Sequence, residues 1–294
     1  MRAELFVDAR CELGEGIIWD AGRACLWWTD IDGRQIWKCD PATRATERFT
    51  PPDRVGFLAV ATNGRLLLGA AKALYMATPG ADGTLPVTRL VDLEPDLPTT
   101  RANDAKADRH GNVVFGTLDE QKPRQALGRF YQFSSKHGLR PLDLPRCRVS
   151  NSISFSPDGR TLYFTDTPTG IIRRGDYDAA AAAVTNVRDF VVIDSHDGHP
   201  DGSIVDADGC LWNCAWGGAI VRRFTPAGRL DRSVEIPTNN PTCPAFGGAG
   251  LASLYVTSSR QQHTPDELAA APHAGGVFTA RVDDVCGLAD SPFV

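Results

Sequence analysis

The sequence predicts an all-β protein, a six-bladed β-propeller. Six segments share one pattern, in which a glycine-containing turn leads into short strands, and they recur roughly every 40–50 residues. A repeat of this length with about four strands per unit is typical of propeller blades. The strands are rich in Val, Ile, Leu and aromatic residues, with Gly, Pro and Asp-Gly between them. The six repeats begin at Gly22, Gly64, Gly111, Gly159, Gly209 and Gly250.

Two segments outside this pattern carry their own expectations. The opening segment AELFVDAR (residues 3–10) reads as a strand without a blade, so we expect it to pair with the last blade and close the ring. The run DAAAAAV (178–184) lacks an amphipathic stripe and is expected to be a loop or one helical turn. No linker interrupts the repeat, so residues 1–294 are expected to form a single domain. The alternative is an unclosed all-β sandwich.

Composition restricts the function classes. The chain has 294 residues, a formal net charge of −5, 42% hydrophobic residues and 23% charged residues, which is ordinary for a globular protein. Because Lys and Arg are scattered, we expect no nucleic-acid partner. No stretch resembles a membrane span or a secretory signal. We therefore expect a cytoplasmic protein with its eight cysteines reduced. A monomer and a small homo-oligomer both remain open.

Four segments place a polar or charged residue directly before an apolar strand. In a propeller the innermost strand of each blade begins near the axis, so side chains at these positions should converge from blades far apart in sequence. The segments are LGEGIIW with Glu15, TRANDAKAD with Arg101, Asn103 and Asp104, VSNSISFSPDG with Asn151, and GHPDGSIVDADG with Asp201.

Three of these residues form a potential metal site. Glu15, Asn151 and Asp201 would offer two carboxylates and one amide oxygen, a ligand set for a hard divalent cation. We therefore predict one divalent metal ion at the central axis, which would also neutralise the buried carboxylate of Glu15. Oxygen ligands suit Ca²⁺, Mg²⁺ or Mn²⁺, and Zn²⁺ and Fe²⁺ stay open. The alternative for each residue taken alone is a turn cap, the commonest role of Asp and Asn before a strand.

The same segments resemble a known family. Their motifs are similar, in order and in spacing, to those of the SMP-30/gluconolactonase/LRE-like family, the regucalcin group of sugar lactonases. The similarity runs from about residue 11 to about residue 260. It implies a six-bladed propeller with one divalent metal at the axis. The matching segments are LGEGIIWD (13–20), RANDAKADRHGNVVFGTLD (101–119), SNSISFSPDGRTLYFTDT (150–167) and HPDGSIVDADGCLWNCAWGG (199–218).

The resemblance implies a reaction as well as a fold. Glu15, Asn151 and Asp201 match the metal ligands of the family, and Asp201 also matches its proposed catalytic acid/base. The implied activity is that of a carboxylic-ester hydrolase, which opens an aldono-, aldaro- or deoxyaldono-lactone to the sugar acid. The metal would polarise the ester carbonyl. Asp201 would take a proton from the attacking water and deliver it to the departing ring oxygen, which requires one carboxylate oxygen free of the metal.

Substrate contacts are implied at further positions. Arg101 and Asn103 match residues that contact the sugar lactone, and their side chains can bind its hydroxyl groups or a carboxylate. In some members an acidic residue after the third-blade GT also binds substrate. Here the segment reads GTLDEQ, so Asp119 or Glu120 would take that role. Ala102 departs from the aromatic residue of some members, and this bears on which lactone fits.

Two other functions share the same predicted site. One is a non-enzymatic, calcium-binding propeller, and the other is a metal-dependent esterase or phosphotriesterase of related fold. Arg101 beside Asn103 argues against a structural ion, since such an ion needs no cationic group next to it. An ester or organophosphate pocket should be more apolar. The chain has no G-x-S-x-G elbow and no H-E-x-x-H motif.

Aromatic and histidine residues near Asp201 allow two interpretations. His196 and His199 could contact substrate, or they could simply lie beside a glycine-rich turn. Trp212 and Trp216 could wall a sugar pocket, although packing between blades is favoured for both.

Overall fold

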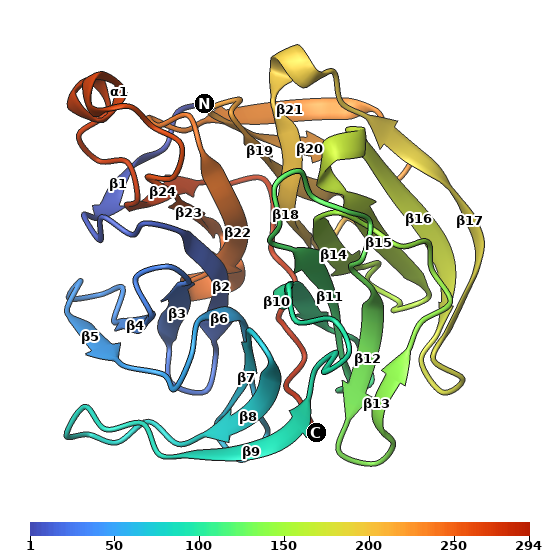
Figure 1. Ribbon diagram of the computed structural model, residues 1–294. Coiled ribbons are helices and arrows are strands. Elements are labelled where there is room, and N and C mark those ends of the chain that lie inside the picture. Colours follow the sequence, from blue (N-terminus) through green and yellow to red (C-terminus); the bar gives the residue numbers. More distant parts are fainter.

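Six four-stranded antiparallel sheets surround a central axis in the computed structural model, which describes residues 1–294 (Figure 1). The predicted all-β, six-bladed β-propeller is therefore confirmed. Consecutive strands within each sheet pair as antiparallel neighbours, running from the axis to the rim. We number the blades in chain order, so that β2, β6, β10, β14, β18 and β22 are the innermost strands of blades 1 to 6.

The first three blades come from the N-terminal half of the chain. Blade 1 contains β2 (Gly14–Asp20), β3 (Cys25–Asp30), β4 (Gln35–Cys39) and β5 (Thr46–Phe49). Blade 2 contains β6 (Val55–Val60), β7 (Leu66–Ala70), β8 (Ala73–Ala77) and β9 (Val87–Asp92). Blade 3 contains β10 (Thr100–Ala107), β11 (Val113–Asp119), β12 (Phe130–Ser134) and β13 (Gly138–Pro141).

The other three blades complete the ring. Blade 4 contains β14 (Ser150–Phe155), β15 (Thr161–Asp166), β16 (Ile171–Asp178) and β17 (Ala183–Val192). Blade 5 contains β18 (His199–Val205), β19 (Leu211–Trp216), β20 (Ile220–Phe224) and β21 (Leu230–Glu235). Blade 6 contains β22 (Pro241–Gly247), β23 (Ser253–Ser258), β24 (Val277–Arg281) and β1 (Glu4–Val7).

Helical structure is confined to short connections. They are the 3₁₀ turns η1 (Thr167–Thr169), η2 (Ser195–Asp197) and η3 (Ala249–Leu251), and the α-helix α1 (Pro265–Ala270). None of them has the length or apolarity to cross a membrane. Within the alanine-rich run at 178–184, residues 179–182 form the turn between β16 and β17, while its two ends belong to these strands, so the expected loop is limited to four residues.

The sequence repeat is offset from the blades by one strand. Each repeat-starting glycine lies in the connection between the first and second strands of a blade, not at the blade boundary. Five of these glycines, including Gly64 and Gly209, have positive φ angles of 65–81°, which favour glycine because it lacks a Cβ atom. The tight first hairpin therefore supplies the strongest repeating signal, while the blade itself begins one strand earlier.

The hydrophobic core consists of six layers between neighbouring blades. The largest layer joins blades 5 and 6 and includes the fully buried Trp212 and Phe278. Another joins blades 1 and 2 around Trp27 and Leu66, and the layer between blades 6 and 1 contains Trp28. Because each blade buries both faces against its neighbours, the reactive groups at the axis are carried by a rigid ring.

Every innermost strand contains a β-bulge at a similar depth. At this point its pairing with the second strand shifts by at least one residue, which bends the strand and redirects its side chains. The shift follows Glu15, Val55, Ala102, Asn151, Pro200 and Pro241. The fold thus repeats one local irregularity six times around the axis.

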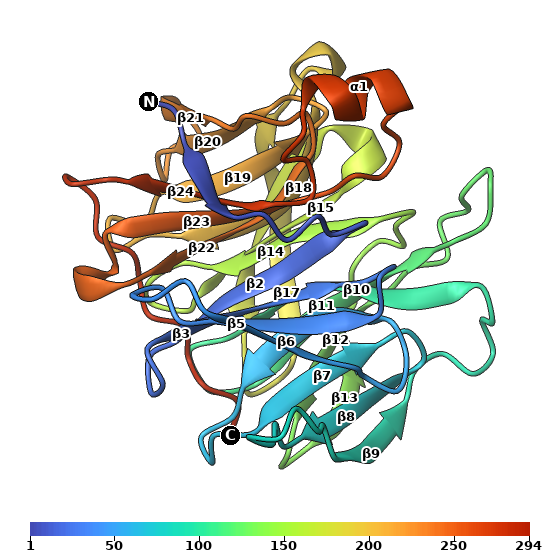
Figure 2. The same cartoon turned by 90° about the vertical axis from the view of Figure 1, so that its left-hand side faces the viewer.

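The two end segments of the described chain bind to distant parts of the ring. β1 pairs antiparallel with β24 as the outermost strand of blade 6 (Figure 2). Residues 282–294 cross the face of the ring at the far ends of the inner strands. The backbone N–H of Ala207 donates to the carbonyl of Cys286 (2.9 Å), and that of Phe293 donates to the carbonyl of Val60 (2.8 Å). This segment therefore joins blades 5 and 2 across the axis.

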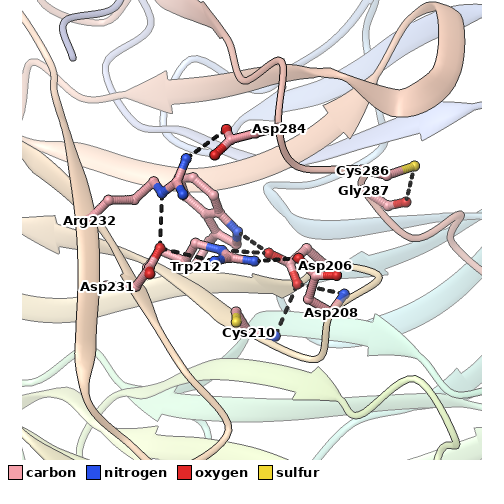
Figure 3. Close-up of polar contacts among 10 residues, drawn as sticks. Asp206, Asp208, Cys210, Trp212, Asp231, Arg232, Asp284, Cys286 and Gly287 are labelled. Carbon is pink, nitrogen blue, oxygen red and sulfur yellow. Dashed lines mark hydrogen bonds and ion pairs between the residues drawn. The ribbon is translucent and has the colours of Figure 1, made fainter.

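A buried ion network braces blade 5 near this crossing (Figure 3). Asp206 follows β18 and accepts hydrogen bonds from Trp212 Nε1 and Arg223 Nε, both at 2.8 Å. The remaining nitrogens of the Arg223 guanidinium donate to Asp208 and Asp231, at 2.8 and 2.9 Å. One buried cation thus satisfies three carboxylates and fixes the first hairpin of the blade to its outer strand.

Candidate active site

A cavity of about 250 Å³ opens at the end of the ring where the inner strands begin. Its wall contains Glu15 from β2, Arg101 and Asn103 from β10, Asn151 from β14 and Asp201 from β18. The structure thus brings together five of the seven side chains that the sequence predicted for the site. They come from four different blades, which explains their wide separation along the chain.

The β-bulges account for this convergence. Asn103 lies inside the shifted segment of β10, and Asp201 lies inside that of β18. Glu15 and Asn151 are the last regularly paired residues before the shifts in β2 and β14. Since a bulge turns a side chain out of the regular alternation of a strand, these polar groups point to the axis and not into the apolar layers between blades.

Burial raises the pKa of two acidic side chains of the pocket. Burial and the neighbouring charge of Asp104 raise the pKa of Glu15 to about 8. Burial, followed by the charges of Glu15 and Asp104, raises the pKa of Asp201 well above its usual range. Asp104 follows Asn103 in β10 and lies outside the cavity wall, where desolvation raises its pKa to about 7. Its charge acts on both pocket carboxylates, so Asp104, which the sequence analysis named without a role, contributes to the electrostatics of the site.

The residues present fit a divalent cation. The carboxylate of Glu15 accepts one hydrogen bond, from the backbone N–H of Gly16 at 3.1 Å, and neither Glu15 nor Asp201 has a Lys or Arg partner within ion-pair distance. Two facing carboxylates without a counter-ion are costly to bury, and a divalent cation would remove that cost. No three His, Cys, Asp or Glu side chains are placed to share an ion. The candidate ligand set is therefore two carboxylates and the amide oxygen of Asn151.

Hydrogen bonds connect the predicted substrate residues with Asn151. Arg101 Nη1 donates to Asn103 Oδ1 at 2.7 Å and to the carbonyl of Ala102 at 2.9 Å. Asn103 Nδ2 donates to the carbonyl of Ser150 at 2.8 Å and to Asn151 Oδ1 at 3.1 Å. The three polar side chains of blades 3 and 4 thus form one connected group on the pocket wall.

Glu120 contacts arginines beside the pocket. Its two carboxylate oxygens accept a bidentate pair of hydrogen bonds from Arg54, each at 2.7 Å, and one of them lies 3.3 Å from Arg101 Nε. Although partial burial opposes the shift, Arg54 and Arg101 hold the pKa of Glu120 below its usual range. The side chain of Glu120 does not line the cavity. Instead it supplies the buried guanidinium of Arg101 with a counter-ion.

Asp119 is also outside the cavity wall. Its buried carboxylate accepts hydrogen bonds from the backbone N–H groups of Gln121 and Gln125, at 3.2 and 2.7 Å. It therefore shapes the loop that follows β11. The structure places Asp119 and Glu120 around the pocket rather than in its wall, and the expected contact of either side chain with substrate stays a prediction.

Other pocket residues escaped the sequence reading or were left open by it. His199 and Trp216 line the cavity, whereas His196 is exposed outside it and Trp212 is fully buried between blades. The favoured packing between blades is therefore confirmed for Trp212 and wrong for Trp216, which ends β19 at the pocket. Loop residues also contribute to the wall, and a periodic sequence pattern cannot predict their positions. These are Arg124, Thr167, Pro168, Gln261 and Gln262.

A larger cavity, about 480 Å³, lies at the opposite ends of the same inner strands. It is lined by Ile18 and Trp19 of β2 and by residues 290–292 of the crossing segment. An ion pair of 3.0 Å between Lys106 and Asp290 lies in its wall. It contains none of the predicted site residues, so the chemistry is concentrated in the smaller cavity.

Comparison with known proteins places these features in one family. The sequence model for the SMP-30/Gluconolactonase/LRE-like region matches residues 13–260. An L-arabinolactonase from Azospirillum brasilense is 42% identical and the match covers 95% of this chain and 92% of that protein. A 6-deoxy-6-sulfogluconolactonase from Pseudomonas putida is 31% identical, over 96% and 94% of the two chains. The crystal structure of a calcium-binding protein, regucalcin, from Agrobacterium tumefaciens superimposes with a TM-score of 0.92 at 30% identity, covering 99% and 97% of the chains. The chain belongs to the SMP-30/gluconolactonase/LRE-like family.

Proposed function

We propose that this protein hydrolyses a sugar lactone to the open sugar acid, with a divalent cation bound by Glu15, Asn151 and Asp201. The observation that carries this proposal is the composition of the pocket. Two carboxylates without a counter-ion, Asp201 buried and Glu15 half-buried, share one small cavity with the hydrogen-bonding pair Arg101 and Asn103. The first group suits a cation, and the second suits the hydroxyl groups of a sugar.

The relatives support this reaction and suggest where to begin. Proteins named as sugar lactonases match nearly the full length of this chain at 31–42% identity. The relative at 42% identity is an L-arabinolactonase, so a five-carbon aldonolactone is the first substrate to test. The cavity, about 250 Å³, is of a size for one small sugar ring.

Asp201 is the proposed acid/base. A bound divalent cation would polarise the ester carbonyl and balance the negative charge that develops on its oxygen. Asp201 takes a proton from the water that adds to the carbonyl carbon. When the bond from that carbon to the ring oxygen breaks, Asp201 returns the proton to the departing oxygen. The product is the sugar acid, and Asp201 ends the cycle as a carboxylate.

Arg101 and Asn103 are the proposed substrate-binding residues. Arg101 is buried, and its hydrogen bond to Asn103 together with its ion pair to Glu120 limits its movement. A guanidinium held in this way can donate to ring hydroxyls without first being ordered, which places the ester carbon against Asp201. In this scheme Glu120 acts through Arg101, and Asp119 acts through the loop whose backbone it binds.

The test is proton release from a panel of sugar lactones. Protein stripped with a chelator is assayed alone and after addition of Ca²⁺, Mg²⁺, Mn²⁺, Zn²⁺ or Fe²⁺. We expect metal-dependent hydrolysis above the spontaneous rate, with L-arabinonolactone among the substrates. If the metal binds but no lactone is hydrolysed, the lactonase proposal fails. The non-enzymatic, cation-binding propeller would then be the better reading of the site.

A further inference from the structure

We propose that Thr167 is a positioning residue for the metal site, because its hydroxyl determines which end of the Asn151 amide faces the axis. Thr167 begins the 3₁₀ turn η1 after β15 and lines the pocket beside Asn151. This inference rests on the ligand set of the proposed function. It assigns a role to a residue outside that set.

The hydroxyl of Thr167 joins the two strands that carry Asn151 and Asp201. Asn151 Nδ2 donates to Thr167 Oγ1 at 2.8 Å, and Thr167 Oγ1 donates to the carbonyl of Pro200 at 2.9 Å. Pro200 directly precedes Asp201 in β18. One side chain from blade 4 therefore contacts a ligand residue of its own blade and the backbone next to a ligand residue of blade 5.

The direction of these hydrogen bonds follows from their end points. A carbonyl can only accept, so the single hydroxyl hydrogen of Thr167 must be given to Pro200. The hydroxyl oxygen can then only accept from Asn151, which requires the NH₂ end of the amide on that side. As a result, Asn151 Oδ1 must face away from Thr167.

The opposite end of the network imposes the same orientation. A guanidinium can only donate, so the 2.7 Å contact from Arg101 fixes the oxygen of Asn103 on the side of Arg101. The NH₂ group of Asn103 then faces the carbonyl of Ser150 and Asn151 Oδ1. The Arg101 guanidinium, which can only donate, and the Pro200 carbonyl, which can only accept, thus fix the orientation of the two amides between them, those of Asn103 and Asn151. Asn151 Oδ1 has a second lone pair, which stays available to a cation.

Loss of the Thr167 hydroxyl should therefore weaken cation binding. In Thr167→Val a methyl group replaces the hydroxyl at nearly the same size, so Asn151 Nδ2 and the carbonyl of Pro200 both lose their partner. The amide is then held only by the hydrogen bond from Asn103 Nδ2, so it can rotate more easily and present its NH₂ group to the cation. Residues that orient metal ligands typically change the affinity by about 10- to 100-fold. Thr167→Ser keeps the hydroxyl and should bind metal nearly as well as the wild type.

The experiment is isothermal titration of Mn²⁺ and Ca²⁺ into chelator-stripped, full-length protein without any lactone. We expect the dissociation constant of Thr167→Val to rise by roughly 10- to 100-fold, with rescue in Thr167→Ser. Thr169→Val is the matched control. Thr169 lies in the same turn, and its hydroxyl binds the carbonyl of Asp166, away from the ligands. Thermal unfolding of each stripped protein shows whether the variants fold.

Each outcome has a defined meaning. Wild-type affinity in a folded Thr167→Val overturns the inference, and so does equal weakness in Thr167→Val and Thr167→Ser, because the hydroxyl retained in Thr167→Ser would then fail to restore binding. If the wild type binds neither ion, the inference falls together with the metal site. Because no lactone is present, a weakened Thr167→Val with rescue supports the inference even if the lactonase assay fails.

Discussion

Gly56 offers the sharpest test of how the ring positions its reactive groups. It lies in β6, the inner strand of blade 2, where it passes the bulge of β10 in blade 3. A Cβ atom on Gly56 would lie 2.6 Å from the carbonyl oxygen of Ala102 and 2.8 Å from that of Asn103. Both obstacles are backbone atoms, so no side-chain rotation can relieve them. We therefore predict that Gly56→Ala displaces the strand that carries Arg101 and Asn103.

The size of the effect follows from these distances. Cβ atoms essentially never approach other heavy atoms within 3.0 Å, so β10 must move by at least about 0.4 Å. Forcing one methyl group into a packed region costs about 1–3 kcal/mol of stability. Misplacement of binding groups by up to 1 Å can lower catalysis by as much as about 100-fold. We expect kcat/KM for the lactone to fall roughly 10- to 100-fold while the variant still folds.

The assay combines urea unfolding with steady-state lactone hydrolysis. Gly22→Ala is the control, because its nearest obstacle is a side-chain oxygen of Asp20 at 3.4 Å, an ordinary contact, in an exposed turn. It should change neither quantity appreciably. If Gly56→Ala matches the wild type in both stability and kcat/KM, the close approach of β6 to β10 does not determine the geometry of the site.

Three further substitutions test single roles. Asp201→Asn removes the proposed base, so hydrolysis measured by proton release should fall by about 10²–10⁴-fold; a variant with near-normal turnover would exclude Asp201 as acid/base. Glu120→Gln weakens the counter-ion of Arg101. Since one binding interaction is lost, we expect KM to rise roughly tenfold, with kcat and metal affinity little changed. A fall in kcat alone would contradict a positioning role. Burial and the charge of Glu94 raise the pKa of Tyr131 to about 12, from about 10 in an unfolded chain. The neutral phenol therefore contributes stability below pH 10 that is lost as the pH rises through 12. Tyr131→Phe should show a smaller decrease in Tm between pH 10 and pH 12 than the wild type, and an equally steep decrease would refute this assignment.

Much of the fold was predictable because it is periodic. Six glycine turns indicated six blades, yet they marked the first hairpin and not the blade boundary, since the inner strands lack a repeated residue of their own. The five pocket residues were found because each stands at the beginning of an inner strand, where the architecture determines the direction of the side chain. Asp119 stands at the end of β11, where the side chain follows the local path of the next loop. A periodic sequence pattern does not predict the path of that loop, so it could not predict where the Asp119 side chain lies.

Most of the pocket residues that sequence reasoning did not find also lie outside the periodic pattern. Thr167, Arg124 and Gln261 lie in turns and loops whose conformation depends on contacts between blades. Thr167 is the clearest example, since its partner Pro200 belongs to another blade and lies 33 positions later in the chain. Asp104 differs, because the sequence analysis named it in its inner-strand segment but assigned it no role. Asn103 lines the cavity, whereas Asp104 Oδ2 accepts a hydrogen bond from the backbone N–H of Ile153 at 2.8 Å and Asp104 lies outside the wall.

The six bulges do not all carry the same kind of side chain. Blades 1, 3, 4 and 5 present reactive side chains at this depth, whereas blade 2 presents Gly56 and blade 6 presents Thr242. Thr242 Oγ1 donates to the carbonyl of Gly14 at 2.5 Å and thereby ties the last inner strand to the first. Gly56 and Thr242 therefore mark contacts between neighbouring inner strands, and the other four blades supply the polar side chains of the pocket. Reactive groups could be exchanged at the four positions to obtain a new specificity, provided that blades 2 and 6 keep their small glycine and their bonded threonine.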